Sequence, residues 1–404
     1  MRSASAERKP HSNPGWAELQ SWHFLRERLP VIHIHARRVA ATCDEFSVEL
    51  YAVTGVTRSS GRTVNCTYDG IYRLTNETIT LDSANHNGSV SYGLDPVGNR
   101  QTEGSSLSGI PSGSWNFNAD DELSSETYDS NGNVLSTGGK TFTYDSENHL
   151  TSMNGSAVTI VYDGDGNRVA KTVNGVTTRY LVDDLNPTGY TQVVEELVAG
   201  AVSRQYSYGL QRIDEYQLIG GTWTASFYGY DGGGNVRNLT NSAGTVTDTY
   251  EYDAFGNKWT VSGTTPNNYL YRGEEFDPDL GLNYLRARYY NPATGRFMSR
   301  DPENGIPTDP ETLHKYLYAG GDPVDKWDPS GRDLIGYAMN LWSRIKTAVA
   351  VAQMGKEDVC VLLYAAETLE CASIVVPGLR EECLVQAEIN LFRCTEGLPP
   401  WPDF

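Results

Sequence analysis

Aspartates that precede proline are the side chains of this chain with the clearest capacity for chemistry. Each carboxylate can start an ordinary turn. Two carboxylates brought together cannot both ionise, however, so one keeps a proton while the other can activate water. The Asp-Pro dipeptides alone favour the turn interpretation. Whether any of these aspartates is catalytic instead depends on the segments in which they lie. The Asp-Pro pairs begin at Asp95, Asp277, Asp301, Asp309, Asp322 and Asp328.

Most of these aspartates fall within residues 269–332, which we expect to form short strands. The aromatics of YLYRGEEF and LNYLRARYY alternate as they do in strands, and the run from Asp277 to Gly281 between them has the proline and glycine of a hairpin turn. A second break at residues 291–295 separates ARYY from RFMS, which predicts three short strands in all. After Asp301 the alternation stops, and a short helix near residues 312–318 is expected to lead into two Asp-Pro turns.

Residues 61–257 repeat a short unit in which Tyr-Asp is followed by Gly-Asn in several copies. We expect each unit to form strand, turn, strand, with the aspartate capping the turn and Gly-Asn in left-handed conformations. One unit cannot bury its own face, so many units must stack into a continuous sheet, with longer strands at residues 183–229. The segment 104–114 is expected to be a surface loop. The Tyr-Asp pairs are Tyr68-Asp69, Tyr128-Asp129, Tyr144-Asp145, Tyr162-Asp163, Tyr230-Asp231 and Tyr252-Asp253.

These units resemble YD repeats, whose family fold is a long β-ribbon that spirals into a hollow shell. Residues 269–332 closely resemble the Rhs repeat-associated core domain, which closes the shell of Rhs and YD-repeat proteins. The resemblance implies a self-cleaving aspartyl protease whose signature is Pro, four residues, then Asp-Pro-x-Gly-Leu. Here the signature begins at Pro323 and continues at Asp328, and Arg332 stands where the family has leucine.

The resemblance also implies roles for individual residues. Arg288 of A-R-Y-Y, Asp301 of the Asp-Pro that follows G-R-F, and Asp328 match the catalytic residues of the family. One carboxyl group would polarise the peptide carbonyl, the other would deprotonate water, and Arg288 would hold the charged carboxylate. The bond to be cut would join Arg332 to Asp333. If the pocket for residue 332 is apolar, it disfavours a guanidinium, and Arg332→Leu should then speed the cut.

Composition agrees with a mainly β protein, because a hydrophobic content of 39% is combined with 40 glycines and 25 tyrosines. We expect an antiparallel β-ribbon of YD repeats that curls into a partial shell and is followed by an all-α tail. The expected domains are an N-terminal segment without repeats, disordered or misassigned, at residues 1–60; the YD repeats at 61–268; the Rhs repeat-associated core at 269–332; and a variable helical tail at 333–404.

The tail contains cysteines at mirror-symmetric spacing, namely Cys360, Cys371, Cys383 and Cys394. Helical periodicity runs over residues 334–355, 356–375 and 379–394. Eleven positions at ~100° per residue bring both cysteines of one helix onto one face. An antiparallel hairpin therefore predicts the disulfides Cys360–Cys394 and Cys371–Cys383. Reduced core cysteines are the alternative, and zinc is disfavoured because side chains so far apart cannot share one metal.

The sequence predicts no metal or cofactor site. Residues 163–167 have the first three ligand positions of an EF-hand loop, but Arg168 stands where that loop needs glycine and Asn174 where it needs glutamate. No zinc motif, P-loop, dinucleotide fingerprint or G-x-S-x-G elbow is present in the sequence. We therefore expect Asp163 and Asn167 to cap a turn.

Two functions remain open from the sequence. In the first, the chain is the C-terminal part of a polymorphic-toxin-like protein whose β shell encloses the helical tail and releases it by self-cleavage, so the only substrate of the enzyme is itself. In the second, it is a non-enzymatic cell-surface protein that mediates adhesion or carbohydrate binding, with the tail as a structural cap. Exposed rows of aromatic side chains on the sheet would favour the second.

Charge and hydropathy limit the partners. A net charge of −19 argues against nucleic acid as the partner of the main domain. The expected partners are the chain's own tail, a cell-surface glycan or target-cell protein, and an immunity protein. No apolar run approaches the ~20 residues needed to span a bilayer. We expect a secreted or cell-surface protein whose export route is not visible in the sequence.

Overall fold

The computed structural model describes residues 33–43, 46–58, 61–110, 112–186, 188–305, 310–332 and 335–336, with only the backbone considered for residues 33–52 and 335–336. Within these ranges all regular structure is β-strand or short 3-10 helix, which confirms the mainly β fold. The predicted tail helices and the disulfides of Cys360, Cys371, Cys383 and Cys394 lie outside the described residues, as does Asp333. None of the described helices has the length and apolar character required to cross a membrane.

Two antiparallel sheets contain most of the strands, and in both sheets each strand pairs with its neighbours along the chain. This order confirms sequential antiparallel stacking of the hairpins, but the single continuous sheet expected from the repeats is divided in two between β7 and β8. Strands β14–β18 provide the longer strands expected at residues 183–229. The first sheet consists of β1 (His33–Cys43), β2 (Phe46–Thr57), β3 (Thr63–Tyr68), β4 (Leu74–Thr80), β5 (Gly88–Leu94), β6 (Arg100–Ser105) and β7 (Gly113–Ser114). The second consists of β8 (Thr127–Tyr128), β9 (Val134–Thr137), β10 (Lys140–Tyr144), β11 (Leu150–Met153), β12 (Val158–Tyr162), β13 (Arg168–Val173), β14 (Val176–Asp183), β15 (Gln192–Val198), β16 (Ala201–Tyr208), β17 (Arg212–Ile219), β18 (Thr222–Tyr230), β19 (Val236–Thr240), β20 (Val246–Tyr252) and β21 (Lys258–Ser262).

The turn after Tyr128 shows how a Tyr-Asp unit builds this ribbon. The Asp129 carboxylate accepts hydrogen bonds from the backbone N–H groups of Asn131 and Asn133 and from the side-chain amide of Asn133, each at 2.9 Å. Gly132 between them has a φ of +81°, which glycine adopts without steric cost. The strand register shifts at Tyr128. The expected left-handed conformation therefore holds for the glycine only, because the asparagine contributes its side chain instead.

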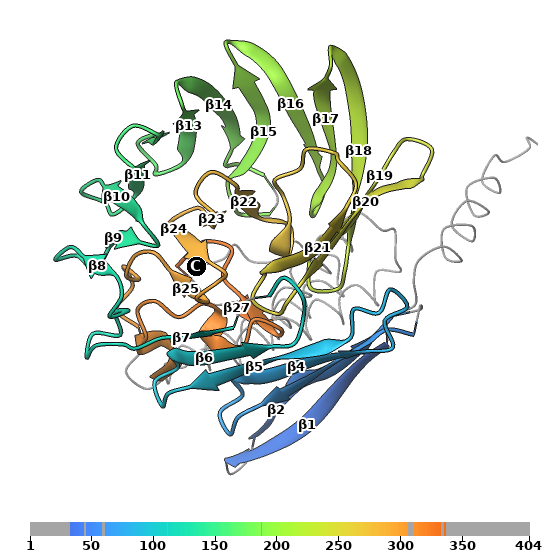
Figure 1. Ribbon diagram of the computed structural model, residues 1–404, viewed down its shortest axis with the longest axis vertical. Helices are drawn as coiled ribbons and strands as arrows, with labels where there is room; N and C mark the ends of the chain where they lie inside the picture. The colour runs from blue at the N-terminus through green and yellow to red at the C-terminus, as the bar shows by residue number, and fades with distance from the viewer. Residues whose placement is uncertain are drawn as a thin grey trace, which may run out of the picture.

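Residues 269–332 lie inside the curve of the two sheets (Figure 1). After η1 (Tyr271–Gly273), a four-stranded sheet is formed by β22 (Glu275–Asp277), β23 (Leu282–Leu285), β24 (Arg288–Asn291) and β25 (Arg296–Phe297). The expectation of three strands is wrong, because Arg286, with a φ of +59°, turns the chain inside LNYLRARYY. The expected helix at 312–318 is also wrong. Two 3-10 turns, η2 (Pro310–Leu313) and η3 (Ala319–Gly321), precede the hairpin of β26 (Lys326–Trp327) and β27 (Ile335–Gly336).

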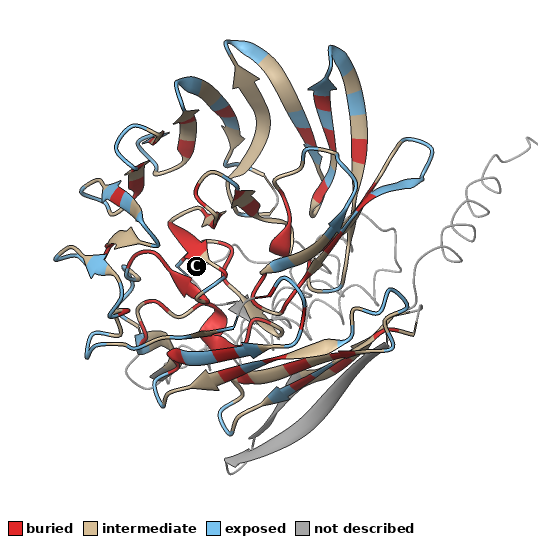
Figure 2. Ribbon diagram, viewed as in Figure 1, coloured by how far each residue is buried: buried red, intermediate tan, exposed pale blue. Residues whose placement is uncertain are grey.

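The hydrophobic core lies between this inner sheet and the strands around it, and Figure 2 shows buried residues concentrated there. Tyr290 and Tyr318 are stacked with ring centroids 4.1 Å apart, and Phe297 meets Tyr318 edge to face at 5.8 Å. The segment 104–114 contributes to the core as well, since Leu107 and Ile110 are buried against β3–β5 and Phe255. The surface-loop prediction is therefore wrong for these two side chains.

The first sheet contacts the C-terminal end of the second sheet. Arg58 pairs with Glu251 of β20 at 2.5 Å, and Glu77 of β4 accepts a hydrogen bond from the backbone N–H of Ala254 at 2.8 Å. We call this contact between the two sheets the seam. It joins residues of the first sheet to the turn and strand that precede β21.

Candidate active site

Arg288, the first residue of β24, brings together the residues to which the family resemblance assigns catalysis. Its Nη2 lies 2.8 Å from Oδ2 of Asp301 and 3.2 Å from Oδ2 of Asp328. The guanidinium is buried and lies over the ring of Phe297, 3.7 Å from the ring centroid. One nitrogen atom therefore bridges two carboxylates that are 27 residues apart in the sequence, and the predicted cluster of Arg288, Asp301 and Asp328 exists as a geometric unit.

The main chain around Lys315 fixes two members of this cluster. The Lys315 carbonyl accepts hydrogen bonds from the backbone N–H of Asp301 at 2.8 Å and from Nη1 of Arg288 at 3.3 Å. Asp301 in turn accepts a hydrogen bond from the backbone N–H of Glu303 at 2.9 Å. Asp301 also starts an ordinary turn, so its structural and chemical interpretations are compatible.

Asp328 is the more deeply buried carboxyl group, with 5% of its side chain exposed against 18% for Asp301. Burial raises the pKa of Asp328 to about 6, against the opposing effects of Arg288 and of hydrogen bonds from Ser330 and the backbone of Arg332. Burial likewise lowers the pKa of Arg288, although the charges of Asp301 and Asp328 oppose the shift. Desolvation therefore favours the protonated form of Asp328, which is the form able to donate a proton.

The chain that leads to the predicted cleavage bond is anchored on Asp328 itself. Oδ1 of Asp328 accepts hydrogen bonds from the Ser330 hydroxyl at 3.1 Å and from the backbone N–H of Arg332 at 3.0 Å. Arg332 is exposed, so its guanidinium is hydrated and does not occupy an apolar pocket. Asp333, on the far side of the bond, lies outside the described residues.

The sequence did not reveal the residues that support this cluster. Phe297 beneath Arg288, the Lys315 carbonyl and the Ser330 hydroxyl all contact it. Two of these contacts use groups that give no sequence signal, because any residue has a carbonyl and serine is common in turns. The aromatic residue of G-R-F was the one available signal, since it lies four residues before Asp301.

In the described part of the chain, no group of three or more histidine, cysteine, aspartate or glutamate side chains is placed so that it could hold a metal ion. In the loop that resembles the start of an EF-hand, the Asp163 carboxylate accepts hydrogen bonds from the backbone N–H groups of Asp165 and Asn167. This loop is the turn cap that the sequence predicted.

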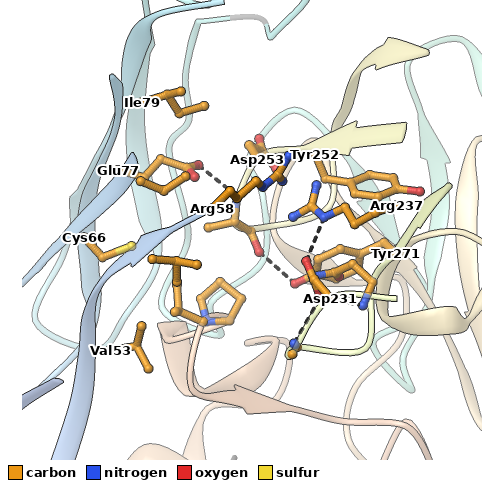
Figure 3. A pocket seen from close by; sticks show the side chains of 18 of the residues that line it. Val53, Arg58, Cys66, Glu77, Ile79, Asp231, Arg237, Tyr252, Asp253 and Tyr271 are labelled. Atoms are coloured by element: carbon orange, nitrogen blue, oxygen red, sulfur yellow. Dashed lines mark hydrogen bonds and ion pairs between the residues drawn. The ribbon is translucent and has the colours of Figure 1, made fainter. Parts of the chain in front are cut away.

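A cavity of about 160 Å³ lies at the seam (Figure 3). Of its charged side chains, Arg237 pairs with Asp231 at 2.7 Å and also with Glu251, outside the lining, at 3.1 Å. Glu77 accepts the hydrogen bond from the backbone N–H of Ala254 across the seam, and burial raises the pKa of Glu77 to about 8. Of these polar groups, Arg58 and Glu77 make contacts that join the two sheets.

A ribbon of Tyr-Asp hairpins around an inner sheet that carries two bridged carboxylates defines a YD-repeat shell protein of the Rhs type. The family model of the teneurin YD-shell matches residues 118–324, and the chain belongs to this family.

Two bacterial relatives are nucleases by name. The tRNA3(Ser)-specific nuclease WapA of Bacillus spizizenii is 35% identical over 262 residues, which cover 60% of this chain and 11% of the relative. The tRNA nuclease WapA of Bacillus subtilis is 34% identical over 262 residues, with the same shares covered. The match thus spans about a tenth of the length of these relatives.

Solved structures with a similar fold include the Tc holotoxin pore of Photorhabdus luminescens, at 16% identity and a TM-score of 0.40 over 69% of this chain and 18% of that one. The TcdB2–TccC3 complex matches at 14% identity and a TM-score of 0.38, covering 75% of this chain and 20% of that one.

Proposed function

We propose that this chain forms an Rhs-type shell that encloses its own tail and cuts itself once, between Arg332 and Asp333. The observation that carries the proposal is the bridge that Arg288 makes between Asp301 and Asp328, with the backbone of Arg332 bonded to Asp328. The two carboxyl groups and the last residue before the bond thus lie in one cluster. The chain would be a protease whose only substrate is itself.

In this mechanism the two carboxyl groups have different tasks. Asp301, the more exposed group, takes a proton from water, whose oxygen adds to the carbonyl carbon of Arg332. Asp328, whose pKa is raised to about 6, donates its proton to the carbonyl oxygen. The bond to the nitrogen of Asp333 then breaks, and that nitrogen takes the proton held by Asp301. One hydroxyl group of the diol returns its proton to Asp328, which leaves Arg332 with a carboxyl group and restores both aspartates. Arg288 orients both carboxylates throughout.

The hairpin of β26 and β27 supports retention of the tail after the cut. Lys326 pairs with Gly336 and Trp327 pairs with Ile335, so strands from both sides of the bond are paired. Their backbone pairing does not depend on the bond between residues 332 and 333. After the cut, the tail stays bound to the shell as cargo without a covalent link. The described residues do not specify the target of the tail or its immunity partner. The protein acts outside the cell or at its surface.

The mass of the purified chain tests this proposal directly. We expect incubation of the folded protein to yield two fragments that separate in denaturant at the bond after Arg332 and that remain together on native size exclusion. A folded chain of unchanged mass after prolonged incubation would remove the protease proposal.

The rate of the cut should depend on pH. Because Asp328 must be protonated and its folded pKa is raised to about 6, the competent form is present below pH 6 and is lost as the pH rises through that value. We expect the rate to fall about tenfold for each pH unit above 6. Fragment yield over time in buffers from pH 5 to 9 measures this, and a flat profile would contradict the role of Asp328 as the acid.

Substitution of Arg332 tests the departure from the family signature. The sequence-based hypothesis was that leucine would speed the cut if the pocket were apolar. Because Arg332 is exposed, we expect Arg332→Leu to change the rate by less than about threefold, in line with the small effect of an exposed substitution. A much larger acceleration, measured as fragment yield over time, would show that the reacting conformation buries this side chain.

An adhesive function is the second candidate, and one surface feature favours it. Tyr216 of β17 and Trp223 of β18 are stacked with ring centroids 5.3 Å apart and planes 11° from parallel. Tyr216 is exposed, as is the neighbouring Leu218, while Glu215 and Gln217 of the same strand are buried on the opposite face. A paired aromatic surface of this kind could contact a cell-surface glycan. This candidate gains weight if the chain never cuts itself.

A further inference from the structure

The turn between β23 and β24 holds the chain immediately before the cleavage bond, one residue after another. Nη1 of Arg286 donates to the carbonyl of Pro329, and the backbone N–H of Ala287 donates to the carbonyl of Ser330 at 3.1 Å. Nε of Arg288 donates to the carbonyl of Gly331. Three consecutive donors therefore hold three consecutive carbonyl groups, in order.

Arg286 is held in place by groups outside the catalytic cluster. Its Nε donates to the carbonyl of Thr191 at 3.1 Å, and its Nη1 pairs with Glu274 at 3.1 Å. The guanidinium also lies over the ring of Tyr190, 5.2 Å from the centroid. Its φ of +59° is uncommon for a residue with a side chain, so the surrounding structure determines this conformation.

The fit between this turn and residues 329–331 is close. A Cβ atom on Gly331 would lie 2.4 Å from the Leu285 carbonyl oxygen and 2.9 Å from the Arg288 nitrogen. Only glycine permits that approach. The hydrogen bonds from the turn to residues 329–331 all go to main-chain carbonyl groups. The turn therefore requires glycine at 331 but makes no hydrogen bond to the side chains of Pro329 and Ser330.

We propose that residues 286–288 form a main-chain clamp that sets the register of the cleaved segment, with Arg286 as a positioning residue. The clamp fixes residues 329–331, and Asp328 fixes the nitrogen of Arg332, so the next carbonyl along the chain is the one presented to the two carboxyl groups. The cut site is then chosen by position along the chain. The clamp rests on the proposed self-cleavage. It also predicts a single turnover, because the new end at Arg332 stays clamped in the site.

The test compares Arg286→Ala with Arg204→Ala in the full chain. Arg204 is a matched control, since its side chain is 18% exposed and pairs with Glu196, while that of Arg286 is 17% exposed and pairs with Glu274. We expect Arg286→Ala to slow the cut about ten- to a hundredfold, the scale of a small misplacement of reacting groups. A share of fragments should end at bonds other than the one after residue 332. The pH profile should keep its shape, and Arg204→Ala should cut as the wild type does.

Arg286→Lys keeps the charge beside Glu274 but cannot donate to Thr191 and Pro329 together, so we expect an intermediate rate. If Arg286→Ala fails to fold, this milder variant decides the question. A folded Arg286 variant that cuts at the wild-type rate and at a single bond would overturn the clamp. A wild-type chain that never cuts removes the proposed function itself, which is a distinguishable result.

Discussion

Asp328→Asn is expected to leave the folded chain uncut, with a rate at least about a hundredfold below that of the wild type, as for loss of a general acid. An amide has the shape of the carboxyl group but cannot donate a proton to the Arg332 carbonyl oxygen. Its oxygen can still accept the hydrogen bonds that Asp328 now accepts from Ser330 and from the backbone of Arg332. The amide nitrogen would replace Oδ2, which now accepts a hydrogen bond from Arg288, so the variant loses both the acid and this contact. Intact-mass measurement over several days is the appropriate readout.

Two further variants complete this experiment. Asp301→Asn removes the proposed base and should be equally inactive. Asp95→Asn is the matched control, because Asp95 also precedes proline and its carboxylate accepts hydrogen bonds from the backbone N–H groups of residues 97–99, yet it lies outside the cluster. If Asp301→Asn and Asp328→Asn both cut themselves at the rate of Asp95→Asn, then Asp301 and Asp328 serve only as turn residues.

The repeat was the most predictable part of the fold. Its chemistry is local, because the Asp129 carboxylate bonds only to groups two and four residues further along the chain. A short pattern is therefore enough to define the hairpin, and sequential stacking of hairpins follows. The seam was not predictable, since Glu77 and Ala254 are 177 residues apart and neither the strand that holds Glu77 nor the turn that holds Ala254 carries a signal for the pairing.

The inner sheet was mispredicted where tertiary contacts override local preference. Arg286 is not a turn residue by type, but its interactions with Thr191, Glu274 and Pro329 hold it at positive φ. Leu107 and Ile110 lie in a stretch rich in glycine and serine that indicated a surface loop, although their apolar side chains are buried. In both places long-range contacts outweigh the local composition.

For the site, family resemblance supplied what spacing could not. The aspartates at 301 and 328 look like four other Asp-Pro turns in the sequence, and only the fold brings them to one guanidinium nitrogen of Arg288. The donors of the turn between β23 and β24 were out of reach for another reason. They donate to main-chain carbonyl groups, so within residues 329–331 only the glycine at 331 reflects the close approach of the turn.

A buried charge network joins the inner sheet to the shell. Arg168 of β13, 1% exposed, pairs with Glu275 of β22 and lies 3.6 Å from Asp277, which is fully buried. Its guanidinium also lies between the rings of Tyr180 and Tyr284, at 4.6 and 4.3 Å from their centroids. Burial already raises the pKa of Glu275, and the charge of Arg168 opposes this shift.

Arg168→Met should therefore destabilise the protein strongly, by about 3–5 kcal/mol, the cost of breaking a buried ion pair by removing one partner. Without Arg168 the pKa of Glu275 should rise further. This rise sets the pH dependence of the free energy of unfolding, because a carboxyl group whose folded pKa is raised contributes more stability at low pH and loses it as the pH rises. The deficit should thus be smaller at pH 5 than at pH 8. Urea unfolding followed by tryptophan fluorescence measures the free energy of unfolding at each pH. The control is Arg179→Met, at an exposed arginine of the adjacent strand β14. If the two variants unfold at the same urea concentration at pH 8, the network does not hold the inner sheet to the shell.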